Sequence, residues 1–210
     1  LDPDSPLYIF NGLATGSIMP TACRVSFCGR SPLTGIWNEA NMGGHFAAEL
    51  RKAGLDGLVI SGKAAQPVYL YVHDGTLEIR PATHLWGLDT FDTYDQLIAE
   101  THPKARAAVI GPAGERLVHF AAVVQGGRTH SRAAGRGGMG AVLGSKLIKG
   151  IVAYGLEKVE THDPIRYREL VKQQNPIIQC KTDGLSKFGT AGVLAGAEGR
   201  GDLPSHNYKG

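Results

Sequence analysis

The stretch from Arg128 to Gly150, RTHSRAAGRGGMGAVLGSKLIKG, decides between two kinds of fold. It contains the letters G-x-G-x-x-G, which in dinucleotide-binding folds form a tight turn that holds a pyrophosphate. That turn requires a buried strand directly before its first glycine. Here the preceding apolar run ends near Gln125, and polar residues stand where the strand should be. We therefore expect a different fold, with a nicotinamide-dependent oxidoreductase kept as an alternative.

Glycine and arginine in this stretch are suited to binding an anion. Glycine has no side chain, so its backbone N–H can come close to a phosphate, and the short helix predicted over 139–147 adds its positive end. Arg128, Arg132 and Arg136 supply forked guanidinium donors that match phosphate oxygens. The alternative is a glycine-rich surface loop with solvated arginines.

A second cluster, earlier in the chain, has the same character. It contains Arg24, and the run NEANMGGHF places Asn41 two residues before Gly43. Asn41 has two interpretations: it caps the helix that follows, or its side-chain oxygen binds a hard cation such as Mg²⁺. Both clusters together favour a site for a phosphate and its counter-ion.

Composition excludes several classes of protein. The net charge of +3 comes without any lysine- or arginine-rich run, which disfavours nucleic acid as a partner. Three cysteines without a C-x-x-C motif favour a reducing, cytoplasmic setting. No apolar run approaches the ~20 residues of a membrane-spanning helix. The chain begins without Met and enters a strand-like run almost at once, so we expect a segment cut from a larger protein.

Apolar periodicity predicts a mixture of strands and helices rather than regular βαβ units. The clearest element is a hairpin over 67–80, with Asp74-Gly75 as its turn. Charged residues increase after about Glu157, which places a domain boundary near Gly155. The predicted strands cover residues 7–13, 24–28, 55–62, 105–111, 117–125 and 151–155, and the predicted helices cover 46–53, 91–100, 139–147 and 163–175.

Five runs occur in an order and spacing that resemble a known family over almost the whole chain, from Ile9 to Ala153. They are SPLTG, NEANMGGHFAAELRKAGLDGLVISGKAAQPVYLYV, LEIRPATHLWG, AAVIGPAGERLVHFAAVV and RAAGRGGMGAVLGSKLIKGIVA. Together they resemble the N-terminal domain of the tungsten-containing aldehyde ferredoxin oxidoreductase family. A later run, LSKFGTAGVL, is similar to the start of the second domain of that family.

The resemblance implies an α+β fold in which two mixed β-sheets with short helices form a base under a bis-pterin cofactor. Residues 1–155 would be the pterin-cradling domain, without its first strands, and 156–210 the start of a helical second domain. Members of the family bind tungsten or molybdenum between two pterin dithiolenes whose phosphates share Mg²⁺. A [4Fe–4S] cluster passes the electrons to ferredoxin, and an aldehyde is oxidised to a carboxylate.

The resemblance also implies the positions of the cofactor site. Asn41 and the backbone carbonyl of Ala133 fall on the magnesium-binding positions. The positions that contact the pterin are Arg24, Asn41, Gly43, Arg132, Ala133, Gly135 and Arg136.

The sequence lacks the iron–sulfur cluster ligands and the proton-transfer residues of the family. The cluster cysteines and the proton-transfer residues of the family lie in later domains, so no catalytic residue is assigned here. Cys23, Cys28 and Cys180 do not have the cluster spacing and are interpreted as packing or incidental thiols. The chain alone is therefore expected to be inactive and to need the remaining domains of its parent enzyme. The alternative is an isolated, non-catalytic binding or interaction domain.

Overall fold

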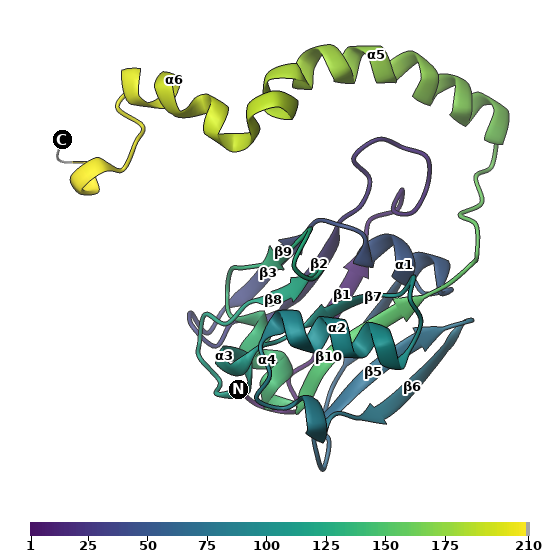
Figure 1. The fold of residues 1–210 in the computed structure, drawn as a ribbon, viewed down its shortest axis with the longest axis vertical. Helices are drawn as coiled ribbons and strands as arrows, with labels where there is room; N and C mark the ends of the chain where they lie inside the picture. Colours follow the sequence, from purple (N-terminus) through teal and green to yellow (C-terminus); the bar gives the residue numbers. More distant parts are fainter. Residues whose placement is uncertain (209–210) are drawn as a thin grey trace. The chain divides into compact units, whose positions relative to one another are not determined.

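Two β-sheets and a group of short helices build the larger part of the molecule (Figure 1). The structure, a computed structural model, describes residues 1–208. The chain forms two compact units, Leu1–Glu160 and Thr161–Gly210. The first unit contains both sheets and all seven of the predicted cofactor-binding residues.

The first sheet has four strands, all antiparallel, in the order β3-β2-β1-β4. Alternate side chains of a strand point to opposite faces. In β1, Leu7 and Ile9 are fully buried, whereas Tyr8 and Phe10 lie on the outer face. This alternation is why one face of the sheet enters the core and the other does not. The strands are β1 (Leu7–Asn11), β2 (Val25–Arg30), β3 (Trp37–Met42) and β4 (Gly57–Ile60).

The second sheet has six strands in the order β6-β5-β10-β7-β8-β9. It is mixed, because β10 runs parallel to β5 while the other neighbouring pairs are antiparallel. The predicted hairpin is confirmed as β5 and β6, joined at Asp74-Gly75. The strands are β5 (Val68–His73), β6 (Thr76–Pro81), β7 (Arg106–Val109), β8 (Val123–Gln125), β9 (Arg132–Ala134) and β10 (Ile148–Tyr154).

Short helices pack on the sheets, and the longest of them in this unit, α2, packs against β7 (Figure 1). It begins at Thr90 because the Asp89 carboxylate caps it, accepting hydrogen bonds from the backbone N–H groups of Phe91 and Asp92 at 2.8 Å each. The helices of the first unit are α1 (Phe46–Lys52), α2 (Thr90–Glu100), α3 (Pro112–Glu115), α4 (Met139–Ser145) and the 3₁₀ helix η1 (Thr83–Leu85).

The main apolar core combines buried side chains from both sheets with those of α1 and α4, and Phe27 and Phe46 are its largest members. A smaller cluster joins α2 to the second sheet through Leu97 and Val152. The predicted α+β class, with two sheets and short helices, is therefore confirmed.

Two lysines are fully buried within this unit and hold loops in place. The Lys146 ammonium donates to the carbonyls of Pro3, Ser5 and Gly62. Burial lowers the pKa of Lys146, and Asp4 and Asp2 oppose that shift only in part. The other lysine, Lys149, donates to the carboxylate of Glu115 and to a backbone carbonyl.

One predicted strand is much shorter than expected. The apolar run 117–125 predicts a single strand, but only Val123–Gln125 forms one. Close packing of α3 on α4 turns the preceding segment away from the sheet. A Cβ on Gly144 would lie 2.0 Å from the carbonyl oxygen of Gly114, so these helices touch through bare backbone. The carbonyl of Ala121 accepts a hydrogen bond from Gly140 N–H at 2.9 Å instead of pairing with a strand.

The second unit is helical. The helix predicted over 163–175 is confirmed, and it continues as α5 (Pro164–Phe188). The Asp163 carboxylate caps it by accepting from Arg166 N–H at 2.9 Å. Further short helices follow in the glycine-rich tail. They are η2 (Gly189–Val193), α6 (Leu194–Gly199) and η3 (Ser205–Asn207).

Candidate cofactor site

The two predicted clusters meet where the edges of the two sheets come together. Strand β3 is an edge of the four-stranded sheet, β9 is an edge of the six-stranded sheet, and the two strands pack side by side (Figure 1). Asn41 lies on β3, and Arg132 and Ala133 lie on β9. Residues about ninety positions apart in the sequence are thus brought to one seam.

A cavity of about 460 Å³ opens at this seam. Four of the seven predicted cofactor-binding residues line it: Asn41, Ala133, Gly135 and Arg136. Its other lining residues are Glu39 and Ala40. The cavity therefore joins an amide, a guanidinium, a carboxylate and bare backbone.

Arg24, Gly43 and Arg132 do not line the cavity but lie next to it in the fold. Arg24 directly precedes β2, whose first residue pairs with the last residue of β3. Arg132 pairs with Gln125 across the β8–β9 ladder, and its guanidinium donates to the carbonyl of Ser131 at 2.8 Å. The side-chain amide of Gln125 donates to the carbonyl of Gly43 at 3.0 Å, which ties the loop after β3 to the second sheet.

Glycine at the seam serves two different purposes. At Gly137 the backbone φ is +73°, and a Cβ would lie 2.1 Å from Cγ of Asn38, so the seam closes only around a bare backbone. Nearby, Asn38 Nδ2 donates to the carbonyl of Arg136 at 3.4 Å. Gly43 and Gly135 differ, because a Cβ on either would meet nothing within 4 Å. These two glycines leave open backbone beside the cavity, which is the space that a bound group would need.

Glu39 is the one charged residue in the cavity that the sequence analysis did not single out. Its Oε1 accepts hydrogen bonds from Asn41 Nδ2 at 2.5 Å and from Ser26 Oγ at 2.9 Å. Glu39 and Asn41 are two residues apart on β3 and so share a face of the strand, a signal that was present in the sequence. On the next strand Cys28 pairs with Glu39, and burial, with a smaller contribution from Glu39, raises the pKa of the Cys28 thiol.

One expectation about this region and one of the two interpretations of Asn41 are wrong. A strand does precede Gly135, because Arg132–Ala134 forms β9. It is a short edge strand that pairs antiparallel with β8, not the buried parallel strand of a dinucleotide fold. Asn41 does not cap the following helix: it lies within β3, and the residue before α1 is His45. The cation-binding interpretation of Asn41 stays a prediction.

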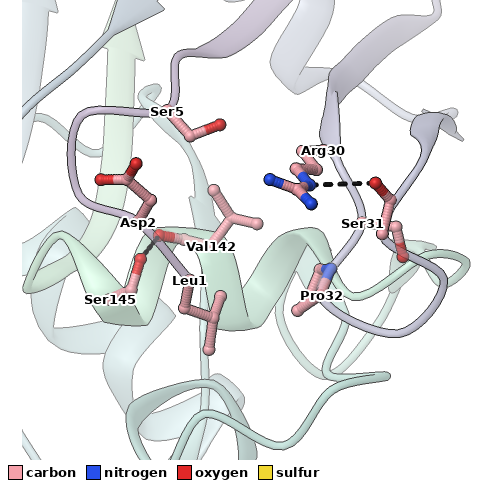
Figure 2. Close-up of a pocket in the computed structure, with 9 residues that line it drawn as sticks. Leu1, Asp2, Ser5, Arg30, Ser31, Pro32, Val142 and Ser145 are labelled. Carbon is pink, nitrogen blue, oxygen red and sulfur yellow. Dashed lines mark hydrogen bonds between the residues drawn. The ribbon is translucent and has the colours of Figure 1, made fainter.

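Further cavities lie outside the predicted site, and two of them involve residues of α4 or β8. One of about 240 Å³ is formed between the first residues of the chain, the turn after β2 and α4, and Figure 2 shows Arg30 beside it. The Arg30 guanidinium donates to the carbonyl of Gly35 at 2.9 Å. None of the seven predicted residues lines that cavity. The other, of about 530 Å³, is lined by His45, His130 and the buried Gln125, among others.

Within residues 1–208 no group of three or more His, Cys, Asp and Glu side chains is arranged to hold a metal. All three cysteines are free thiols. The thiol of Cys23 donates to the carbonyl of Gly44 at 2.6 Å, so it helps to hold the loop after β3. None of the described helices combines the length and the apolar character needed to cross a membrane.

The fold is that of a recognised domain class. The model of the aldehyde ferredoxin oxidoreductase N-terminal domain matches residues 1–155, and the chain belongs to this family. It is 43% identical over 213 residues to a tungsten-containing aldehyde ferredoxin oxidoreductase of Pyrococcus abyssi, a match that covers 99% of this chain and 34% of the relative. The corresponding enzyme of Pyrococcus furiosus is 40% identical over 215 residues, covering 100% of this chain and 35% of the relative. The chain thus spans about a third of the length of these relatives.

Relatives with other names share the domain. An aliphatic sulfonate oxidoreductase, WOR-like subunit, of Pyrococcus furiosus is 34% identical over 187 residues, covering 82% of this chain and 29% of the relative. Among solved structures, the active site complex BamBC of benzoyl coenzyme A reductase superposes with a TM-score of 0.81 at 34% identity, covering 86% of this chain and 27% of that one.

Proposed function

We propose that residues 1–155 cradle a tungstopterin, or its molybdenum counterpart, and that residues 156–210 begin a helical second domain of the same enzyme. The observation that carries the proposal is the cavity at the β3–β9 seam, which gathers four of the seven predicted residues from two distant parts of the chain. Family membership supports the proposal, since the matched relatives are tungsten-containing oxidoreductases by name.

The residues at the seam fit the phosphate end of a pterin with its magnesium. Arg136 lines the cavity, Arg132 directly precedes the lining residue Ala133 on β9, and Arg24 directly precedes β2, the neighbour of β3. We propose that these guanidinium groups bind phosphate oxygens. Gly43 and Gly135 present open backbone, where N–H groups can approach an anion. We assign the phosphate to these donors.

The proposed position of the cation follows from two oxygen atoms that line the same cavity. Asn41 and Ala133 line the same cavity, and each carries a neutral carbonyl oxygen, on the side chain and on the backbone respectively. Mg²⁺ prefers oxygen ligands and keeps several waters when it bridges phosphates. We assign Mg²⁺ to the Asn41 Oδ1 and the Ala133 carbonyl, where it would neutralise charge between the two pterin phosphates.

In the parent enzyme we propose oxidation of an aldehyde to a carboxylate, with the electrons passed through a [4Fe–4S] cluster to ferredoxin. The tungsten–pterin group supplies that redox chemistry when bound. The residues of this chain bind and orient the group, and none of them is assigned to the reacting atoms. The cluster ligands and the substrate pocket are assigned to the remaining domains.

The test measures cofactor and activity separately. The native gene product is produced with tungstate in the medium, and tungsten, pterin, magnesium and aldehyde-dependent viologen reduction are determined. Protein that carries neither metal nor pterin would contradict the proposal, and protein that carries both without aldehyde activity would contradict only the substrate. In the same protein, Arg132→Ala should weaken pterin retention by on the order of 1.5–3 kcal/mol, the value of a charge-assisted hydrogen bond.

A further inference from the structure

We propose that Glu39 is a positioning residue that turns the side-chain amide of Asn41 so that its oxygen is presented to the cation. This inference rests on the proposed function, because it assigns a role in the magnesium site at the β3–β9 seam. It concerns a residue that does not itself need to touch the cation.

The geometry begins with the sheet. Asn41 pairs with Ser26 and Glu39 pairs with Cys28, so all four side chains lie on the outer face of the same two strands. Within that group, Glu39 Oε1 lies 2.5 Å from Asn41 Nδ2 and 2.9 Å from Ser26 Oγ. The carboxylate is therefore held between two donors, one on its own strand and one on the neighbouring strand.

The direction of the Asn41 amide follows from the chemistry of its partner. An ionised carboxylate only accepts hydrogen bonds, so the amide atom that faces Glu39 must be the nitrogen. The oxygen, Oδ1, is then the atom left for another partner, and Asn41 lines the cavity. The two ends of the amide are nearly equal in shape. Without Glu39, the side chain could therefore turn either its nitrogen or its oxygen towards the cavity.

Fixing the amide in advance favours cation binding. A hard cation binds the amide oxygen and is repelled by the amide nitrogen. If the oxygen is already placed, binding does not have to restrict a freely rotating side chain. Residues that orient metal ligands in this way commonly change metal affinity by about 10- to 100-fold when they are replaced.

A hydrogen bond from Ser26 also holds the Glu39 carboxylate in place. Ser26 Oγ donates to the same oxygen of Glu39 that accepts from Asn41. It thereby limits the positions available to the Glu39 carboxylate. Replacement of Ser26 by alanine should weaken magnesium retention less than replacement of Glu39, because the bond from Asn41 remains.

The test is a double-mutant cycle on the native gene product, read by magnesium content after dialysis against increasing EDTA. Glu39→Ala and Asn41→Ala should each weaken magnesium retention, the first by about 10- to 100-fold. If Glu39 acts through Asn41, the double variant should retain as much magnesium as Asn41→Ala alone. Glu39→Gln keeps an acceptor oxygen at the same reach and should fall between the parent protein and Glu39→Ala.

Controls separate this role from a general effect on folding or charge. Glu100 lies on α2, outside the cavity, and its carboxylate bonds to His84 of η1. Glu100→Ala should therefore retain magnesium like the parent protein. The thermal unfolding midpoint of magnesium-free Glu39→Ala should match that of the magnesium-free parent.

Each other outcome has a definite meaning. Unchanged magnesium retention in Glu39→Ala, with loss in Asn41→Ala, would overturn the positioning role and leave the proposed function standing. Additive losses in the double variant would also overturn it, since Glu39 would then act independently of Asn41. Full retention in Asn41→Ala would overturn the positioning role together with the assigned magnesium site.

Discussion

Replacing Lys149 by methionine removes one half of a fully buried ion pair and leaves the other half behind. The side chains of Lys149 and Glu115 are 0% and 5% exposed, respectively. The Lys149 ammonium donates to the Glu115 carboxylate, and it also donates to the carbonyl of Leu88 at 2.8 Å. The carboxylate also accepts from Gly87 N–H, at 3.0 and 2.9 Å to its two oxygens. In the variant a buried negative charge would keep its hydrogen bonds from that N–H but lose its ammonium partner.

The expected cost of Lys149→Met is about 3–5 kcal/mol, because breaking a buried pair leaves an uncompensated charge. With a urea slope of about 2 kcal/mol per molar, the unfolding midpoint should fall by about 1.5–2.5 M. Circular dichroism across a urea series measures this midpoint. A second variant, Lys149→Met with Glu115→Gln, removes both charges and should recover part of the loss.

A matched control is Lys52→Met, which removes a half-exposed lysine paired with Glu49 at 2.8 Å. Partly exposed pairs contribute little, so the expected loss is under about 1 kcal/mol. If Lys149→Met were as mild as this control, the buried pair would not hold the loop before α2 in place. If the double variant were no more stable than Lys149→Met, the uncompensated charge of Glu115 would not be the cause of the loss.

Three further outcomes follow from the structure. Gly144→Ala forces a Cβ to within 2.0 Å of a backbone carbonyl of α3 and should lower the free energy of unfolding by about 1–3 kcal/mol in urea unfolding. Gly135→Ala, which meets nothing within 4 Å, should keep the parent stability and instead lower pterin content. The Glu78 carboxylate, followed by Asp74, raises the pKa of His73, so its titration by NMR should have a midpoint above ~6.5. Because the pKa of His73 is higher in the folded state, its charged pairs stabilise the fold fully below the unfolded pKa, and this stabilisation is lost as pH rises through the folded pKa. Glu78→Gln should lower the midpoint of the His73 titration.

Much of the secondary structure was predictable because its signals are local. The 67–80 hairpin carries alternating residues on both sides of an Asp-Gly turn, and it forms as β5 and β6. The helix predicted over 91–100 forms as α2, and the Asp89 carboxylate caps it. The strand predicted over 117–125 is mostly absent, because the contact between Gly114 and Gly144 of two packed helices governs that segment. No pattern within the segment itself reports such a contact.

The site was predictable in its chemistry and not in its geometry. Glycine and arginine indicated an anion, and an asparagine oxygen indicated a hard cation, from residue type alone. The sequence did not single out Glu39, although its spacing from Asn41 places both on one face of a strand. It also argued against a strand before Gly135, where the structure has β9. A three-residue edge strand whose first two residues are exposed lacks the apolar run by which strands are recognised.

The sequence by itself determined the family, the α+β class and the types of side chain available to a phosphate and a cation. Only the tertiary structure decided that β3 and β9 meet, because each is the edge strand of a different sheet and neither pairs with the other. Their approach depends on bare backbone at Gly137 and on the bond from Gln125 to Gly43. Contacts between strands of different sheets are set by packing of the whole core, and no local pattern in the sequence reports that packing.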